Sequence, residues 1–485
     1  MKLFPKTLLQ KSFFLVLLRG FTSLFNALST ILLARNLGAE NYGQISIVVA
    51  YLAFFQIFAI FGIDHILIRE VAKTADNQNA IFGTALSICI FLSFASLIPA
   101  ILFLSLVNYP AEIKQFIVVC SLNLLFSSAT LLSGLFQAHL KVFYPAISGL
   151  LVAILLFLLN LVFIKNQLPL ICFAFTQTVF IFFQGLVLLL FVKKIPGFSF
   201  VLNFDLKIAK MLLTASFPLV ISALCAFLNL RLDQFLIFTL LDGSKVGLYS
   251  AISRLTEGLN IIPMAVSSLI YPLLCLDFGN FPERFTKLYK VAFKTMGTLI
   301  LPIVVFVSIY SPNILLFIFG QNFLPAARAF SIIIWVAYIR FLGSIMSPTL
   351  NAAGLQGFNL LFAVFGALLS FILNLILIPQ YGIEGAAITM IVSSSGCGGL
   401  VYFISPKTRP FAFAYVGSSL RALMSAVAMG FILNHFKTLS FVFSLLVGMG
   451  LYCFFVFLLK GFDRDDWEAL TANYFKENKD LPNSF

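Results

Sequence analysis

The stretch that decides the fold reads Asp242-Gly243-Ser244-Lys245-Val246-Gly247-Leu248-Tyr249-Ser250 and leads into a long apolar run that ends at Cys275. The run is longer than the roughly 20 apolar residues that cross a bilayer as a helix. It is interrupted by Arg254 and Glu257. Charges are costly inside a bilayer and usually face a bundle interior or a wet cavity. Because the two residues are three apart, they share one helix face and can pair. They form either part of a functional site or a structural ion pair that fixes helix packing.

The composition is that of a polytopic membrane protein. Of 485 residues, 61% are hydrophobic and only 10% are charged, whereas soluble domains carry roughly 25% charged residues. The first apolar run, 12–34, is longer than a signal-peptide core and lacks an obvious small-residue cleavage motif, so we expect it to be retained as a helix. The seven cysteines form no CxxC pair and the three histidines are scattered, so the sequence predicts no metal site, disulfide framework or cofactor.

Apolar runs separated by short polar breaks predict an all-α protein with about fourteen transmembrane helices. Only helices and closed barrels satisfy their backbone groups in lipid, and runs of this length indicate helices. The predicted spans are 12–34, 43–66, 80–108, 115–138, 142–164, 167–192, 211–241, 246–276, 295–319, 326–350, 357–378, 385–405, 410–434 and 438–459.

The lysine and arginine counts of the loops give the orientation. With the N-terminus in the cytoplasm, the cytoplasmic loops and tails hold 20 of the 31 basic residues, the opposite side holds 6, and 5 fall inside spans. This bias predicts that both termini are cytoplasmic. It also accounts for the net charge of +13 without nucleic acid, because the basic loops face anionic lipid headgroups. Two basic connections, 193–210 and 282–294, are interpreted as interfacial amphipathic segments that anchor the topology.

The two halves of the chain resemble each other in register. Segment 41–46 parallels 245–250, segment 136–143 parallels 351–358, and segment 159–161 parallels 373–375, at offsets of 204, 215 and 214. Spans one to six therefore match spans seven to twelve, which predicts a parallel repeat about an axis along the membrane normal. Such repeats are typical of transporters, whose substrate site lies at the repeat interface. The predicted domains are an N-terminal six-helix lobe (1–194), a cytoplasmic linker (195–210), a C-terminal six-helix lobe (211–405), two extra helices (406–460) and a cytoplasmic tail (461–485).

The charges inside the predicted spans are mainly cationic, with five arginines against three acids. This excess indicates an anionic ligand such as phosphate, because guanidinium binds phosphate through two parallel hydrogen bonds. The alternative is that the arginines snorkel to the interface, especially Arg19 and Arg421. Arg254 and Arg340 are the stronger candidates to line a cavity. We assign candidate substrate-binding roles to Arg254, Arg340, Arg19 and Arg231, and candidate ion-coupling roles to Asp233, Glu257 and Asp64.

Short motifs occur in a fixed order along nearly the whole chain. They are Leu33-Ala34-Arg35-Asn36-Leu37-Gly38 with Tyr42-Gly43, Gly62-Ile63-Asp64, Arg69-Glu70, Asp233, Val246-Gly247-Leu248-Tyr249, Arg254-Leu255-Thr256-Glu257, Phe319-Gly320-Gln321-Asn322-Phe323, Leu350-Asn351-Ala352-Ala353-Gly354 and Pro379-Gln380-Tyr381-Gly382-Ile383-Glu384-Gly385-Ala386-Ala387. Through these motifs the sequence resembles the Wzx-type oligosaccharide flippase branch of the MATE-like MOP superfamily.

The resemblance implies two six-helix lobes that face each other in a V, with two further C-terminal helices. It implies a protein of a bacterial cytoplasmic membrane that moves an undecaprenyl-pyrophosphate-linked oligosaccharide from the inner to the outer leaflet. We expect the protein to be a monomer. Family members have functional cationic residues in the central cavity, and Arg19 and Arg254 occupy comparable places. A returning proton or sodium ion would reset the lobes, with Asp233 and Glu257 as the favoured carboxylates.

Two other functions compete with this one. A multidrug or cation antiporter of the same superfamily would need a cavity rich in carboxylates, whereas this chain has surplus arginines. A membrane enzyme such as a polysaccharide polymerase usually needs a large outer loop or a carboxylate cluster that binds a metal ion, and every predicted outer loop is short. The sequence therefore favours a transporter over an enzyme.

Overall fold

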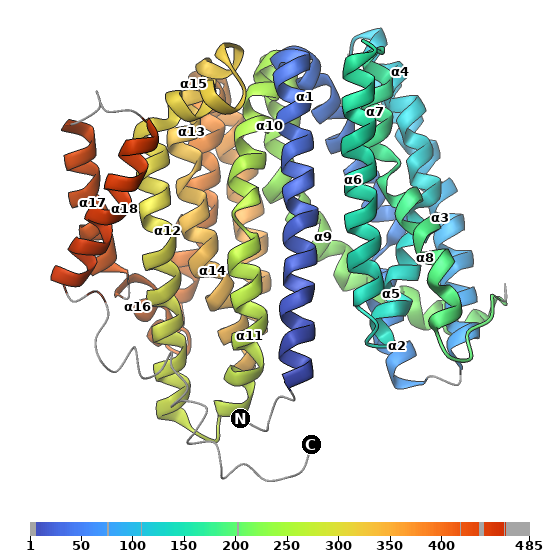
Figure 1. The fold of residues 1–485 in the computed structure, drawn as a ribbon. Coiled ribbons are helices and arrows are strands. Elements are labelled where there is room, and N and C mark those ends of the chain that lie inside the picture. Colours follow the sequence, from blue (N-terminus) through green and yellow to red (C-terminus); the bar gives the residue numbers. More distant parts are fainter. Residues whose placement is uncertain are drawn as a thin grey trace. The chain divides into compact units, whose positions relative to one another are not determined.

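The computed structural model describes residues 6–74, 77–107, 109–200, 203–417, 419–435, 441–459 and 461, and all the regular structure in these ranges is helical (Figure 1). The predicted all-α class is therefore confirmed. The chain forms two compact units, Lys11–Ala251 and Ile252–Phe485, the second of which also includes Met1–Gln10. The predicted tail, 461–485, lies outside the described residues except for Gly461.

The first unit contains α1 (Lys6–Ile60), α2 (Ile63–Lys73), α3 (Gln78–Leu106), α4 (Ala111–Ser121), η2 (Leu122–Ala129), α5 (Thr130–Ala138), α6 (Phe143–Lys165), α7 (Leu170–Thr178), α8 (Phe180–Phe191), η3 (Val192–Lys194), α9 (Leu206–Leu240) and the start of α10 (Gly243–Gly258). The second unit contains the rest of α10, α11 (Ile261–Asp277), α12 (Pro282–Ile318), η4 (Gln321–Ala326), α13 (Ala327–Ile333), α14 (Trp335–Ala352), α15 (Gln356–Ile404), α16 (Arg409–Gly417), α17 (Leu420–His435) and α18 (Phe441–Leu458).

Ten of the described helical stretches are long and apolar enough to cross a membrane, and the bent pair α7 and α8 would make an eleventh. Two of the long stretches contain a sharp break. Gly38 interrupts α1 with φ 78° and Gly382 interrupts α15 with φ 60°. Glycine tolerates this region of backbone space because it has no Cβ. Both breaks fall between spans that the sequence predicts as separate helices.

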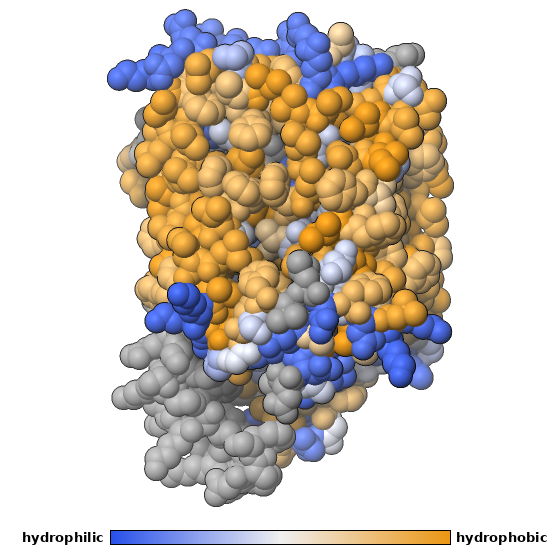
Figure 2. Space-filling model, turned by 90° about the vertical axis from the view of Figure 1, so that its right-hand side faces the viewer, coloured by the Kyte–Doolittle hydropathy of each residue, from blue (hydrophilic) through white to orange (hydrophobic). Residues whose placement is uncertain are grey.

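Large exposed hydrophobic side chains cover the outer surfaces of the helices, among them Phe91, Leu106 and Leu190 at 70%, 78% and 76% exposure. Figure 2 shows a broad hydrophobic band with hydrophilic residues along its upper and lower margins. In water such a surface would drive association. Within a bilayer it is the surface that faces the lipid chains.

Several predicted spans differ from the observed helices in detail. Span 43–66 ends at Ile60, and a turn at Phe61 and Gly62 leads into the separate helix α2. Span 246–276 is broken between α10 and α11. The basic connection 282–294 is not a separate interfacial segment, because it forms the first part of α12.

The segment between α8 and α9 is held against the first unit by side chains at the start of α3. Gln78 Nε2 donates to the Pro196 carbonyl over 2.9 Å, and Asn79 Nδ2 donates to the Gly197 carbonyl over 3.2 Å. His139 Nε2 lies 2.7 Å from Gln78 Oε1. Burial, followed by the charge of Lys141, lowers the pKa of His139, which favours a neutral ring donating to that oxygen. Pro196 and Gly197 of the predicted linker are thus held against the start of α3 by hydrogen bonds.

The helix α9 begins inside the predicted linker because Asp205 caps it. The Asp205 carboxylate accepts hydrogen bonds from the backbone of Lys207 and Ile208, at 2.7 and 3.2 Å. These are two of the donors that a helix N-terminus leaves without an internal partner. Helix α9 then packs against α2 and α3, which places it with the first unit.

Within the first unit, α1 and α10 approach each other at two glycines that the sequence repeat relates, Gly43 and Gly247. A Cβ on Gly43 would lie 1.9 Å from the Gly243 carbonyl oxygen, and a Cβ on Gly247 would lie 1.7 Å from the Ala39 carbonyl oxygen. Small residues at helix crossings in membranes allow this backbone approach. No larger residue fits at either position unless the helices separate.

We predict that Gly43→Ala and Gly247→Ala each destabilise the protein by about 1–3 kcal/mol, the usual range for overpacking. Thermal unfolding of the purified protein in detergent measures the effect. Gly20→Ala in the same helix is the matched control, because its Cβ would meet no atom within 4 Å and alanine favours helix by about 1 kcal/mol. Equal midpoints for all three variants would contradict the close contact.

Candidate functional site

The break between α10 and α11 carries the charged pair that the sequence singles out. Arg254 Nη1 lies 3.8 Å from Glu257 Oε2, so the predicted pairing across one helical turn is confirmed. The Arg254 side chain is 41% exposed and that of Glu257 is 20% exposed. The Arg254 side chain is therefore both paired and accessible, whereas an ion pair that only fixes helix packing needs no exposed guanidinium group.

The backbone of this break is satisfied locally. The Leu259 amide donates to the Thr256 carbonyl over 3.3 Å, and the Asn260 amide donates to the Glu257 carbonyl over 3.0 Å. Helix breaks at membrane depth are tolerated where they are buried in protein or line an aqueous cavity. The turn is slight, because α10 and α11 together form one apolar stretch of 35 residues, Gly243–Asp277.

Arg340 lies half-buried on α14, which packs against α11 in the same unit. Two of the four candidate substrate-binding arginines, Arg254 and Arg340, thus belong to elements of the second unit that are in contact or continuous with each other. The other two belong to the first unit, where Arg19 is exposed on α1 and Arg231 is half-buried on α9.

Asp233 is the most deeply buried candidate carboxylate, at 6% exposure on α9. The hydroxyl of the fully buried Tyr249 donates to Asp233 Oδ2 over 2.5 Å, and the Gln234 amide donates to Oδ1 over 2.8 Å. Donors to a carboxylate stabilise its charged form and offset the cost of burial. Asp64, by contrast, lies half-buried in the first turn of α2, beyond the end of α1 at Ile60.

Tyr249 has no assigned role in the sequence interpretation, although it belongs to the stretch that decides the fold. Its pairing with Asp233 joins residues 16 apart on two helices, so neither helical periodicity nor spacing reveals it. Two facts could have indicated this pair from the sequence. A buried carboxylate requires a hydrogen-bond donor, and an aromatic hydroxyl lies on the next predicted span.

A second polar group also escapes the sequence interpretation. Asn160 on α6 is fully buried, donates to Ser29 Oγ over 2.8 Å and accepts from Thr176 Oγ1 over 2.9 Å. These contacts tie together α1, α6 and α7. Its repeat-related residue, Asn374 on α15, donates to Ser370 Oγ over a longer 3.3 Å. Among the described residues, no group of three His, Cys, Asp or Glu side chains could hold a metal ion.

Comparison with known proteins identifies the family. Residues 8–275, more than half of the chain, match a family described as polysaccharide biosynthesis protein. The chain belongs to this family. The match covers the α10–α11 break and every candidate residue except Arg340, which lies beyond it.

Two relatives have names that refer to glycan transport. The chain is 23% identical over 395 residues to a putative O-antigen transporter of Shigella flexneri, covering 74% of this chain and 88% of the relative. It is 26% identical over 246 residues to a probable low-salt glycan biosynthesis flippase, Agl15, of Haloferax volcanii, covering about half of each chain, at 50% and 51%.

Solved structures show the same fold. The lipid II flippase MurJ in an inward closed conformation gives a TM-score of 0.75 at 16% identity, covering 91% of this chain and 98% of MurJ. An inward-facing multidrug transporter of the MATE family gives a TM-score of 0.62 at 14% identity, covering 84% and 95%. The protein therefore has a MurJ- and MATE-like fold.

We predict that Tyr249→Phe lowers the unfolding free energy by about 2 kcal/mol, because a buried carboxylate loses a donor. The double variant Tyr249→Phe with Asp233→Asn should lose less unfolding free energy than the sum of the two single losses, since the two side chains interact. Thermal unfolding in detergent provides the measurement.

Tyr310→Phe is the matched control for this experiment. Tyr310 is equally buried, at 2% exposure, but its hydroxyl reaches the Leu433 carbonyl only at 3.5 Å. If Tyr249→Phe is no more destabilising than Tyr310→Phe, the short hydrogen bond contributes nothing to stability.

Proposed function

We propose that this protein is a flippase that moves an undecaprenyl-pyrophosphate-linked oligosaccharide from the cytoplasmic to the outer leaflet of a bacterial inner membrane. The observation that carries the proposal is the family match over 8–275, which includes a membrane span broken beside Arg254 and Glu257. The relatives named for O-antigen transport and glycan flipping support the same substrate class. The protein acts as a transporter and catalyses no covalent reaction.

Arg254 is the residue that we assign to the pyrophosphate. A guanidinium group binds phosphate oxygens through two parallel hydrogen bonds, and the exposed Arg254 side chain leaves donors for a ligand beside Glu257. Arg340, on the helix that packs against α11, is assigned to the same anionic group. Arg19 and Arg231 are further candidates from the first unit.

The energetics favour export of this substrate. A pyrophosphate carries roughly two negative charges, and moving each outward across a negative-inside membrane is favourable by about 2.3 kcal/mol per 100 mV. The sugars are the obstacle, because burying their hydroxyls without partners is costly. A proton or sodium ion that returns inward resets the transporter, with Asp233, Glu257 and Asp64 as the coupling carboxylates.

We also infer fourteen transmembrane helices with both termini in the cytoplasm, arranged as two six-helix lobes and two further helices. The ten candidate spans become fourteen when α1 and α15 are each divided at their glycine breaks and the bent pair α7–α8 and the shorter apolar helix α18 are added. The predicted domain boundaries, at 194, 210, 405 and 460, follow from the sequence repeat. They differ from the boundary at Ala251 because α9 packs against the first unit in this structure.

The topology predicts that a reporter fused at Asn77 lies in the cytoplasm and that one fused at Asn108 lies outside. Paired alkaline phosphatase and fluorescent protein fusions measure the two locations. The physical reason is the 20-to-6 distribution of basic residues between the two sides. Reporters that both appear on one side would refute the arrangement.

Translocation is tested with purified protein in vesicles that contain a lipid-linked oligosaccharide. A membrane-impermeant glycosidase measures how much glycan has crossed. We expect Arg254→Lys to reduce the rate moderately, because it keeps the charge but loses the planar fork. Arg254→Ala should reduce it severely, with near-normal amounts of inserted protein.

Arg421→Ala is the control for this series, because it removes an exposed arginine of α17 that is interpreted as snorkelling. If Arg254 is only structural, Arg254→Ala will lower the amount of folded protein in proportion to activity, and Glu257→Ala will partly restore it by removing the orphaned charge. Full translocation by a well-folded Arg254→Ala protein would rule out the role in binding.

A MATE-like multidrug or cation antiporter is the second candidate, and the structural likeness to MATE transporters favours it. The same vesicles distinguish the two functions. An antiporter would exchange a cationic dye for protons or sodium ions and leave the lipid-linked glycan on its original side.

A further inference from the structure

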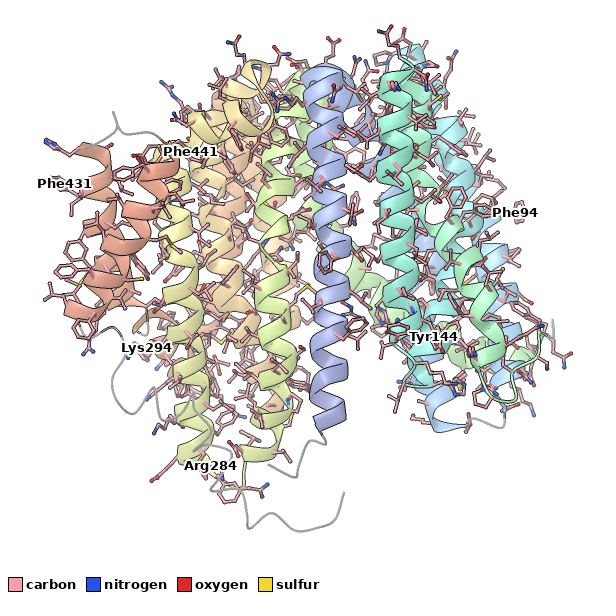
Figure 3. All side chains as sticks on the ribbon, in the orientation of Figure 1. Phe94, Tyr144, Arg284, Lys294, Phe431 and Phe441 are labelled. Atoms are coloured by element: carbon pink, nitrogen blue, oxygen red, sulfur yellow. The ribbon has the colours of Figure 1, made fainter. Side chains whose placement is uncertain are left out.

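The first part of α12 is a cationic arm that continues beyond the predicted span. The helix Pro282–Ile318 has 37 residues and a kink at Tyr310. Along its path it is about 55 Å long at 1.5 Å per residue, whereas the hydrocarbon core of a bilayer is about 30 Å thick. Residues 282–294 precede the apolar part and include one acid and four bases, with a net charge of +3. Figure 3 shows Arg284 near the beginning of α12 and Lys294 further along it. We call residues 282–294 the α12 arm.

One face of the α12 arm is packed and the other is open. Phe285 and Tyr289 form edge-to-face contacts with Phe411 of α16, at 6.3 and 5.2 Å between ring centroids. On the other face, Lys287 and Lys290 are exposed. Within the part of the chain that the structure describes, neither ammonium group takes part in an ion pair. The aromatic contacts fix the helix and hold these two charges outward.

The end of α18 lies beside this arm. The Tyr452 hydroxyl donates to the Thr298 carbonyl of α12 over 2.7 Å. Near the start of α18, Phe441 contacts Phe306 and Tyr310 on α12. The two helices are therefore antiparallel. From Tyr452 to the end of α18 at Leu458 is about 9 Å along the axis, which places that end at the level of about residue 292, near the C-terminal end of the arm.

The chain that follows α18 carries the opposite charge. Gly461 closes the helix with a hydrogen bond from its amide to the Val456 carbonyl over 2.7 Å. Beyond it, 463–468 reads Asp-Arg-Asp-Asp-Trp-Glu, four acids and one base with a net charge of −3. An extended chain covers about 3.4 Å per residue, so the seven residues from Gly461 to Glu468 reach about 24 Å. Lys290 and Lys287 lie only about 3 and 8 Å beyond the level of the α18 end.

We propose that the α12 arm is the docking surface of the acidic segment 463–468 of the same chain. Opposite net charges, the antiparallel register of α12 and α18, and the short connection bring the two together. Arg284 of the arm already lies 3.6 Å from Asp277, so Lys287 and Lys290 carry the contact. The effective concentration of a segment tethered this closely is in the millimolar range, which favours it over a soluble acidic partner. The arm therefore binds the tail instead of anchoring the protein to lipid headgroups, and the proposal does not depend on the identity of the transported substrate.

Carbodiimide cross-linking of the whole protein in nanodiscs tests the contact, because it joins lysine amines to carboxylates that touch. Mass spectrometry should find links from Lys287 or Lys290 to 463–468 at least tenfold more often than links from Lys207 or Lys210. These two lysines are matched controls, since they are exposed on α9 at the same predicted side of the membrane. Raising the salt concentration to about 1 M should reduce the links, since the Debye length falls to about 3 Å.

Charge-reversed variants make the test independent of folding. Lys287→Asp with Lys290→Asp removes both amines and therefore the links. Adding Asp465→Lys with Asp466→Lys should restore them, with the roles of amine and carboxylate exchanged, and this restoration is the test. Equal linking to Lys207 or Lys210 would overturn the proposal. So would links that disappear when nanodiscs with anionic lipid replace purely zwitterionic ones, because lipid headgroups would then be the occupant of the arm.

Discussion

The constraint on which this structure depends is that a peptide group inside a bilayer has no water to bind. Long helices satisfy this constraint for most of the described chain. Polar and charged side chains are tolerated at the few breaks. The α10–α11 break shows how the constraint is met, because the Leu259 and Asn260 amides donate to carbonyls in the last turn of α10. The same turn carries Arg254 and Glu257. Charged side chains and irregular backbone therefore occur together at this point of the chain.

A second constraint, the close approach of α1 and α10, sets the surroundings of Asp233. The Gly43–Gly247 contact leaves no room for a side chain at either position. Tyr249 lies two residues further along α10, and its hydroxyl reaches Asp233 on α9. A wider spacing at Gly247 would move Tyr249 away and remove its hydrogen bond to the buried carboxylate. The packing of small residues and the burial of a charge are thus parts of one local arrangement.

The sequence predicts those features that depend on local spacing. Hydrophobic run length gives the helical class, and a spacing of three residues gives the Arg254–Glu257 pair. Features that join distant residues are not predictable in this way. Asn160 meets Ser29 across 131 positions, and a single apolar pattern cannot reveal it. The sequence also does not predict that 282–294 is continuous with α12, because the basic composition of this segment resembles that of an interfacial segment. Its buried face packs against α16, which is distant in the sequence.

The repeat has an asymmetry that bears on how charge is handled. At the offset of 204, the counterparts of Asp233, Arg254 and Glu257 in the first half are Ser29, Ala50 and Ala53. None of these three counterparts is charged. Ser29 instead belongs to the neutral cluster around Asn160, whose carbonyl accepts from Thr176. A neutral, fully hydrogen-bonded cluster rigidifies its helices without binding an ion. The residues proposed for the anionic headgroup and the coupling ion, Arg254, Asp233 and Glu257, thus have uncharged counterparts at this offset.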